Sequence, residues 1–444
     1  MNPPIVHTLT RTLSPSPDIA RDTGHARPDQ GRESAEHCPS ENTPNSQLTS
    51  PVAPEKPASP HSPQTTTSSL TPDVPVSESA GLPSAAIDAW VTHLIGQVED
   101  SMSAILAAGR ERSTGMDPSY PPLWDALGDA LRGGKRVRPR LVLGAYLALR
   151  TGEDALAVPD SVILTAVAQE LLHGAFVVHD DVIDGDLVRR GHPNVTGNLL
   201  ASHPRRHSDP ARARRDAEAS AIIGGDLLLT AAQRQLALLD VPADVRVNLL
   251  DLFDEAVHVT AGGEHADVVL AALPPGTPPI TRILTMTEHK TASYSFSVPL
   301  RSGAVLAGAD RNLLRALDAV ARALGLAFQL QDDHLGVFGE SARTGKSITA
   351  DLESGKNTAL LSLARASDAW PLISALTTTP DAHTTTHWAG VQEALIRAGV
   401  RDRHHAVVTT ALDRARSAVQ DPALPPRLRA YLDAVIADLE ERDV

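Results

Sequence analysis

Cysteine is nearly missing from this 444-residue chain, which contains only Cys38. One cysteine cannot form a disulfide or a cysteine metal site within a single chain, so the sequence does not describe a disulfide-stabilised secreted domain. The first residues, Met1-Asn2-Pro3-Pro4, also lack the basic and apolar blocks of a signal peptide. We therefore expect a cytoplasmic protein.

Lysine is scarce as well, and no long uninterrupted apolar run suggests a membrane span. The net charge of −14 argues against a nucleic-acid-binding surface. Arginine supplies most of the positive charge, and the lysines are Lys56, Lys135, Lys290, Lys346 and Lys356. The last four lie beside glycine or threonine in short motifs. A compact ammonium group suits phosphate oxygens packed around metal ions.

Composition divides the chain into a tail and a domain. Residues 1–83 are dense in Pro, Ser, Thr and His and poor in large apolar side chains, so they cannot bury enough surface to offset the entropy of ordering. We predict a disordered tail there and one large domain over 84–444. Within the domain, apolar residues such as Ile87, Trp90 and Leu94 recur at helical spacing, without convincing strand alternation. The sequence predicts an all-α helical bundle.

A stripe of polar residues interrupts an otherwise apolar helix predicted from Val162 to Ile183. Its members are Glu170, His173, Asp180, Asp181 and Asp184. Their spacing places them on one side of the helix, facing a shared cavity. Three neighbouring carboxylates repel one another unless cations lie between them, and oxygen ligands suit magnesium holding a phosphate rather than zinc. A solvated acidic helix end is the alternative, but the preceding turns are too apolar for a surface helix.

A second acidic stripe, Gln329, Asp332 and Asp333, follows another apolar run. Alone it fits an exposed helix end equally well, but two facing acidic helices can clamp a diphosphate through bridging metal ions. Cations beside glycine or threonine occur in Gly133-Gly134-Lys135-Arg136-Val137-Arg138-Pro139, Arg189-Arg190-Gly191, Lys290-Thr291, Gly345-Lys346 and Gly355-Lys356. Each alone is an ordinary turn. Together with the acidic stripes they predict a polyphosphate site.

From about residue 84 onward the chain resembles the trans-isoprenyl diphosphate synthases, or polyprenyl synthetase family. The matching blocks are GGKRVRP (133–139), ELLHGAFVVHDDVIDGDLVRRGHP (170–193), GGD (224–226), HKT (289–291), FQLQDDHLGVFG (328–339) and TGKSITADLESGK (344–356). The resemblance implies the isoprenoid synthase helical bundle with a central active-site cavity, and usually a homodimer. It also implies an Mg²⁺-dependent prenyltransferase that joins isopentenyl diphosphate to an allylic diphosphate.

The resemblance further implies a role for each matching side chain. The expected magnesium ligands are Asp180, Asp181, Asp184 and, from the opposite helix, Asp332. The side chains expected around the allylic diphosphate are Arg189, Lys290, Lys346 and Lys356, and Thr291, Gln329 and Phe176 are further expected substrate-binding residues. Those expected around isopentenyl diphosphate are Lys135, Arg138, His173 and Arg190. Asp180, Asp181, Lys290 and Lys346 are the expected catalytic residues. Asp333 and His179 are expected to support these groups, and the role of Arg136 is left open.

The chain departs from the family pattern in three places. Gly336 stands where the second acidic motif usually ends in aspartate, and Glu264 stands where glutamine is common. Residues 198–218 resemble an insertion, for which a solvated loop is the favoured interpretation and a flap over the diphosphates the alternative. Gly336 leaves one outer carboxylate missing, and the resemblance to family members that work with this substitution implies that activity survives.

Product length is expected to depend on side chains one helical turn before Asp180. Ala175 leaves room, whereas Phe176 is expected to form part of the cavity floor, with a plain core aromatic as the alternative. The resemblance favours geranylgeranyl diphosphate as product, then farnesyl diphosphate. Two other functions stay open: a class I terpene cyclase, which does not need the Gly-Gly-Lys-Arg block, and a non-catalytic subunit of a heteromeric synthase, which the intact first acidic motif disfavours.

Overall fold

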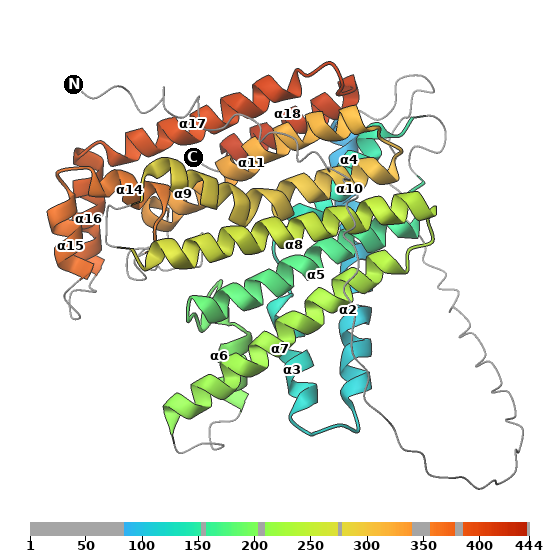
Figure 1. Cartoon of the computed structure of the whole chain (residues 1–444), viewed down its shortest axis with the longest axis horizontal. Helices are drawn as coiled ribbons and strands as arrows, with labels where there is room; N and C mark the ends of the chain where they lie inside the picture. Colours follow the sequence, from blue (N-terminus) through green and yellow to red (C-terminus); the bar gives the residue numbers. More distant parts are fainter. Residues whose placement is uncertain are drawn as a thin grey trace, which may run out of the picture. The chain divides into compact units, whose positions relative to one another are not determined.

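The structure, a computed structural model, is a bundle of helices, as the helical periodicity of the sequence predicts (Figure 1). The structure describes residues 84–151, 157–202, 209–273, 278–339, 356–377 and 385–441. The predicted tail over 1–83 and Lys346 lie outside these residues. Within them the only strands are the two-residue pair β1 (Val188–Arg189) and β2 (His192–Pro193). The all-α prediction is confirmed.

The first half of the chain contributes α5 (Asp160–Ile183), which carries the first acidic motif, and six further helices. They are α2 (Ser84–Ser113), α3 (Tyr120–Ala130), α4 (Val137–Leu149), α6 (Val195–Ser202), α7 (Pro210–Ala237) and α8 (Ala243–Ala271). Figure 1 shows α5 running beside α7 within the bundle, and α2, α4, α6 and α10 also pack against α5. Of the described helices, α5 alone is long and apolar enough to cross a membrane, and most of it is buried, as in the core helix of a bundle.

The second half of the chain continues the bundle, and its second helix is a π-helix. Its helices are α9 (Ile280–Thr287), the π-helix η2 (Glu288–Ser297), α10 (Val298–Leu306), α11 (Arg311–Phe338), α14 (Ala359–Arg365), α15 (Trp370–Thr377), α16 (Thr385–Arg397), α17 (Val400–Val419) and α18 (Pro426–Glu440). The second acidic motif lies near the end of α11, and the HKT block opens η2.

Two glycines let the neighbouring helices approach η2 closely. A Cβ atom added at Gly263 of α8 would lie 2.3 Å from the backbone nitrogen of Lys290. One added at Gly325 of α11 would lie 2.4 Å from the Cα atom of Ala292. Any larger residue would push these backbones apart. The π-helix that carries Lys290 is therefore held between α8 and α11.

The interpretation of residues 198–218 as a solvated loop is largely wrong. Helix α6 runs to Ser202, α7 starts at Pro210, and only 203–208 lie outside the described residues. The side chain of Asp209 accepts a hydrogen bond from the backbone of Ala211, and Pro210 occupies the first turn, which is the usual start of a helix. The many arginines of this segment favoured a solvated loop, whereas Asp209-Pro210 indicates the start of a helix.

A buried histidine joins α11 to α17. His404 of α17 is fully buried, and its ring stacks on that of His334 with centroids 5.8 Å apart. Neither ring nitrogen of His404 has a hydrogen-bond partner among the described residues. Burial, followed by the nearby histidines 334 and 405, lowers the pKa of His404 from 6.5 to about 3. His404 therefore stays neutral in the folded protein at physiological pH.

We expect acid to weaken the fold through His404. Its folded pKa lies below its unfolded value, so this contribution to stability is present above pH 6.5 and is lost as the pH falls toward 3. Between pH 7 and 5, one such histidine costs about 2 kcal/mol of unfolding free energy. Urea denaturation of His404→Phe should therefore show a smaller loss over this range than the unmodified protein. His258→Phe, which replaces an exposed histidine of α8, is the control, and an equal loss in all three proteins would contradict the prediction.

Candidate active site

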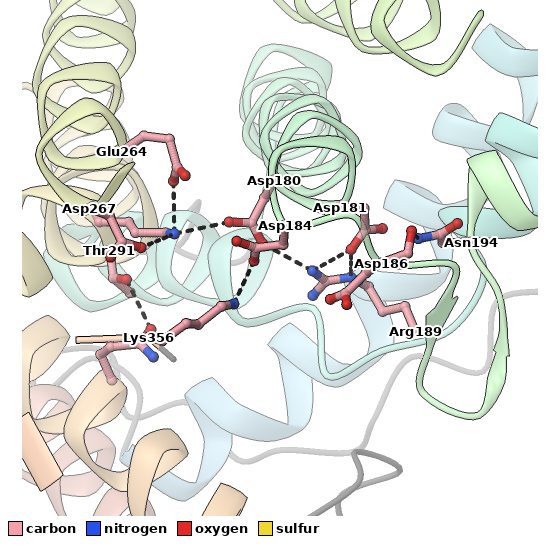
Figure 2. A network of polar contacts seen from close by, with 12 residues as sticks. Asp180, Asp181, Asp184, Asp186, Arg189, Asn194, Glu264, Asp267, Thr291 and Lys356 are labelled. Atoms are coloured by element: carbon pink, nitrogen blue, oxygen red, sulfur yellow. Dashed lines mark hydrogen bonds and ion pairs between the residues drawn. The ribbon is translucent and has the colours of Figure 1, made fainter. Parts of the chain in front are cut away.

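The carboxylates of the first acidic motif are each paired with a cation from another segment (Figure 2). Asp180 and Asp181 lie in the last turn of α5, and Asp184 caps it. Asp181 Oδ1 accepts from Arg189 Nε at 2.8 Å, and Asp180 Oδ2 lies 3.2 Å from Arg189 Nη2. Asp184 pairs with Lys356, which lies 172 residues further along the chain. The first acidic motif, which is the predicted metal site, therefore lies at one end of α5 together with Arg189, Lys290 and Lys356, which are predicted to hold the allylic diphosphate.

Lys290 lies at the centre of three carboxylates. Its Nζ atom is 3.0 Å from Asp180 Oδ1, 2.9 Å from Glu264 Oε2 and 2.8 Å from Asp267 Oδ2. Burial alone would lower the pKa of Lys290, but the three carboxylates raise it well above its usual value. Asp267 was missed at the level of sequence. The available signal was its spacing of three from Glu264, which puts both on one face of α8.

The surroundings shift the pKa values of the carboxylates at this end of α5 in different directions. Burial raises the pKa of Asp181 and of Asp184 above the usual value. Burial would also raise that of Asp180, but Lys290, Lys356 and Arg189 together lower it below its usual value. Burial likewise raises the pKa of Glu264. The carboxylates therefore depend on nearby positive charge to stay ionised in partly buried surroundings.

The donor set fits magnesium shared with a phosphate. Among the residues that the structure describes, no three His, Cys, Asp or Glu side chains are arranged to hold a metal ion by themselves. Mg²⁺ does not need such a cage, because it is commonly bound by one or two carboxylates, substrate phosphates and water. The first motif offers only oxygen ligands, and each is now neutralised by a protein cation.

The second acidic motif reaches the lysine cluster through Thr291. Thr291 Oγ1 donates to Gln329 Oε1 at 2.9 Å, and Gln329 Nε2 donates to Asp333 Oδ1 at 3.0 Å. Asp333 is buried and Asp332 is half-buried on the same turn of α11. Asp333 thus positions Gln329, and Asp332 is left as the metal candidate of this helix. Gly336, one turn later, is buried.

Tyr294 of η2 contacts one cation, Arg138, and two rings of α5. The guanidinium of Arg138 lies 4.6 Å from the centre of the Tyr294 ring, and its Nη2 donates to Ser295 Oγ at 2.7 Å. The His173 ring stacks on Tyr294 at 6.0 Å, and the Phe176 ring meets its edge at 5.0 Å. Sequence reasoning missed Tyr294, although it follows the HKT block by three residues. It joins the predicted isopentenyl diphosphate site to the predicted cavity floor.

A tight hairpin brings Arg190 to the glycine-rich loop. Arg190 and Gly191 join β1 to β2 with φ angles of 54° and 78°, as in a two-residue hairpin turn with both residues left-handed. A Cβ atom added at Gly134 would lie 2.7 Å from Arg190 Nη1, so the guanidinium rests on the glycine-rich loop. Lys135, in that loop, has an exposed side chain. The adjacent arginines 189 and 190 thus contact different parts of the chain: Arg189 pairs with the first acidic motif, and Arg190 lies against the glycine-rich loop.

Arg136 does not join these cations. Its buried guanidinium pairs with Glu170 at 2.9 Å and Glu99 at 3.1 Å, and donates to the carbonyl of Leu131 at 2.9 Å. Its φ of 50° lies in the left-handed region, a strained conformation that these contacts hold. Arg136 and Glu170 therefore fix the glycine-rich loop onto α5, which answers the role left open by the sequence.

Two histidines of α5 differ in their surroundings. Burial, followed by the charges of nearby arginines, lowers the pKa of His173 well below its usual value, so the ring is neutral. His179 contacts α7 instead: its Nε2 lies 3.2 Å from the carbonyl oxygen of Ile222, and a Cβ at Gly225 would collide with the ring. The GGD block that contains Gly225 thus provides room for His179 beside the acidic motif.

The described geometry agrees with comparisons to known proteins. The chain matches the polyprenyl synthetase family over residues 122–383. A (2E,6E)-farnesyl diphosphate synthase of Mycobacterium tuberculosis is 35% identical over 225 residues, covering 51% of this chain and 55% of that protein. A geranylgeranyl diphosphate synthase of Sulfolobus acidocaldarius is 32% identical over 238 residues, covering 52% and 62%. The chain thus aligns with little more than half of these relatives' length.

A solved structure extends the likeness over most of the bundle. The geranylgeranyl pyrophosphate synthase of Corynebacterium glutamicum, complexed with isoprenyl diphosphate and magnesium, superposes with a TM-score of 0.71 at 26% identity. The superposition covers 79% of this chain and 98% of that one. Since the family match spans more than half of the chain and includes both acidic motifs, this protein belongs to the polyprenyl synthetase family.

Proposed function

We propose that this protein is a trans-prenyltransferase that condenses isopentenyl diphosphate with an allylic diphosphate to give a short-chain prenyl diphosphate. The observation that carries the proposal is the pair of separate cation groups along η2. One group, around Lys290, is interleaved with carboxylates, and the other, around Arg138 and Tyr294, is not. Two diphosphates with different metal requirements would be held at such a pair of sites.

The carboxylate-rich group suits the allylic diphosphate. We infer that Arg189, Lys290 and Lys356 exchange their carboxylate partners for diphosphate oxygens, together with Lys346. Asp180, Asp181, Asp184 and Asp332 would hold Mg²⁺, which supplies charge neutralisation for the departing diphosphate. Thr291 and Gln329 keep Lys290 aligned with α11. This arrangement concentrates positive charge where the leaving group develops negative charge.

The second group suits isopentenyl diphosphate. Arg138, Arg190 and Lys135 would bind its diphosphate by charge, and neutral His173 would donate a hydrogen bond. When the allylic C–O bond breaks, its electron pair leaves with the diphosphate. The double bond of isopentenyl diphosphate then forms the new C–C bond, and loss of one proton restores a double bond. Released diphosphate is a suitable acceptor for that proton.

The length of the product belongs to the same proposal. Relatives include synthases named for both the farnesyl and the geranylgeranyl product. We favour geranylgeranyl diphosphate because Ala175 is small, and we assign Phe176 to the floor of the cavity. The edge-on contact between Phe176 and Tyr294 supports this assignment, because it places the ring beside the inferred isopentenyl diphosphate site.

Phe176→Ala is expected to shift products toward longer chains. The change removes roughly the volume of an aromatic ring, and because Phe176 is half-buried its cost in stability should be about 2 kcal/mol. Product lengths are measured by chromatography after incubation with isopentenyl diphosphate and farnesyl diphosphate. Phe253→Ala, which removes a buried ring of α8, is the matched control and should lose stability without changing the products. Active Phe176→Ala with unchanged products would place the floor elsewhere.

The proposal is tested by supplying substrates separately. Purified protein is incubated with Mg²⁺, isopentenyl diphosphate and either dimethylallyl, geranyl or farnesyl diphosphate. Condensation products from the protein alone support the proposal. A cyclic hydrocarbon formed from the allylic substrate alone would indicate a class I terpene cyclase. A folded protein that condenses only after a partner is added would indicate a subunit of a heteromeric synthase, an alternative motivated by Gly336.

We include a homodimer in the proposal, as the family resemblance implies. Exposed apolar side chains on α7 and α8, among them Ile222, Ile223 and Val268, are available for a subunit contact. Sedimentation equilibrium gives the mass in solution. A monomeric mass at micromolar concentration would remove the dimer from the proposal without affecting the assigned chemistry.

A further inference from the structure

A second polar network contacts η2 at both of its ends. At the C-terminal end, Ser297 Oγ donates a short hydrogen bond to Asp318 Oδ1 of α11. At the N-terminal end, Glu288 Oε1 lies 3.3 Å from Arg322 Nη1. Arg322 Nε donates to Asp318 Oδ2 at 2.8 Å and so joins the two ends. These four residues span the whole π-helix with one chain of contacts.

The same network is tied to two further helices. Arg301 Nη1 of α10 lies 2.6 Å from Glu255 Oε1 of α8 and 3.3 Å from Ser297 Oγ. It also lies 3.7 Å from Asp318 Oδ1. Glu255, Arg301, Asp318 and Glu288 have side chains that are 32%, 18%, 24% and 15% exposed. Because these groups are partly desolvated, their contacts are less screened than surface ion pairs.

A small cavity lies inside this network. It measures about 10 Å³ and is lined by Glu255, Glu288, Ser293, Ser297 and Asp318, among others. The hydroxyl of Ser293 lines this cavity, is buried and has no partner in the part of the chain that the structure describes. A polar space of about this size holds one water molecule. Such a water would satisfy Ser293 and join it to the carboxylates.

Between its two ends, η2 carries residues of both inferred diphosphate sites. Lys290 and Thr291 follow Glu288, whereas Tyr294 and Ser295, the partners of Arg138, precede Ser297. A π-helix is rare, and π-helical turns frequently lie at functional sites. We propose that the network Glu288–Arg322–Asp318–Ser297, completed by one ordered water, is a positioning network that holds η2 in π-helical register. Through η2 it aligns Lys290 and Arg138, so both diphosphate sites depend on it.

The effect on substrates rests on the proposed function. Ser297→Ala and Asp318→Asn are each expected to raise KM about tenfold for both isopentenyl and geranyl diphosphate, since small displacements of positioned groups are costly. If both act through one contact, the double variant should be no worse than the poorer single variant. Asp318→Glu, which keeps the charge, should recover most of the loss. Asp413→Asn removes the acid of an exposed pair with Arg416 on α17 and is the control.

Hydrogen–deuterium exchange tests the inference without catalysis. Backbone amides of 288–297 should exchange faster in Ser297→Ala and Asp318→Asn, while α5 and α17 keep their rates. Unchanged exchange in 288–297 would overturn the inference, as would a lower melting temperature with both KM values unchanged. If the unmodified protein condenses nothing but the variants still exchange faster in 288–297, the proposed function fails and the positioning of η2 stands.

Discussion

Asp180→Ala should lower the rate of condensation on the order of a thousandfold while the protein stays folded. Asp180 is the carboxylate of the first motif that contacts both Lys290 and Arg189. Its loss leaves neither cation alone, because Lys290 keeps Glu264 and Asp267 and Arg189 keeps Asp181. Removing one of several crowded carboxylates also relieves repulsion. The expected cause of inactivity is therefore the loss of a magnesium ligand and not unfolding.

The measurement combines turnover at several Mg²⁺ concentrations with a melting curve. Asp186→Ala is the matched control, because Asp186 is an exposed carboxylate two residues after the motif. It should keep near-normal activity. Near-normal turnover of Asp180→Ala at saturating Mg²⁺ would show that the metal assignment is wrong. A collapse of the melting temperature in Asp180→Ala would instead show that the carboxylate is needed for the fold.

The helical periodicity of the sequence predicts the fold, and the short motifs predict most residues of the candidate site. The apolar run before Asp180 predicts a buried helix because a surface helix would need a polar face there. This prediction is confirmed by α5, and the second acidic stripe also lies on a helix, α11, with Asp333 buried. The functional roles of Asp180, Lys290 and the other site residues remain predictions. The contacts that pair Asp180 with Arg189 and Lys290, and Asp184 with Lys356, agree with them.

Contacts between distant helices could not be predicted in the same way. The sequence indicated Glu264 only as a departure from the family pattern, and it did not indicate Asp267, the other α8 carboxylate that pairs with Lys290. Their shared contact with Lys290 depends on the close approach of α8 to η2 at Gly263. Tyr294 could not be predicted for a similar reason: a tyrosine within a helix is usually a core residue, and only packing shows that Arg138 and His173 lie against its ring. The hairpin of Arg189 and His192 is too short for strand periodicity to appear.

Lys290→Met is expected to damage both activity and stability, which separates it from Asp180→Ala. The change leaves Asp180, Glu264 and Asp267 close together without their shared cation. Breaking a buried ion pair costs about 3–5 kcal/mol, and partial exposure of this cluster reduces the expected loss to about 2 kcal/mol. Loss of an ammonium group that we assign to the leaving diphosphate should lower kcat/KM on the order of a hundredfold.

A second substitution distinguishes these two effects. Lys290→Met combined with Glu264→Gln removes one of the stranded carboxylates and restores the glutamine that is common in the family. The double variant should regain most of the lost stability, measured by urea denaturation, because fewer like charges remain unpaired. Its activity should stay as low as that of Lys290→Met, since no cation has been returned to the site. Recovery of turnover along with stability would mean that Lys290 supports the fold and does not bind the diphosphate.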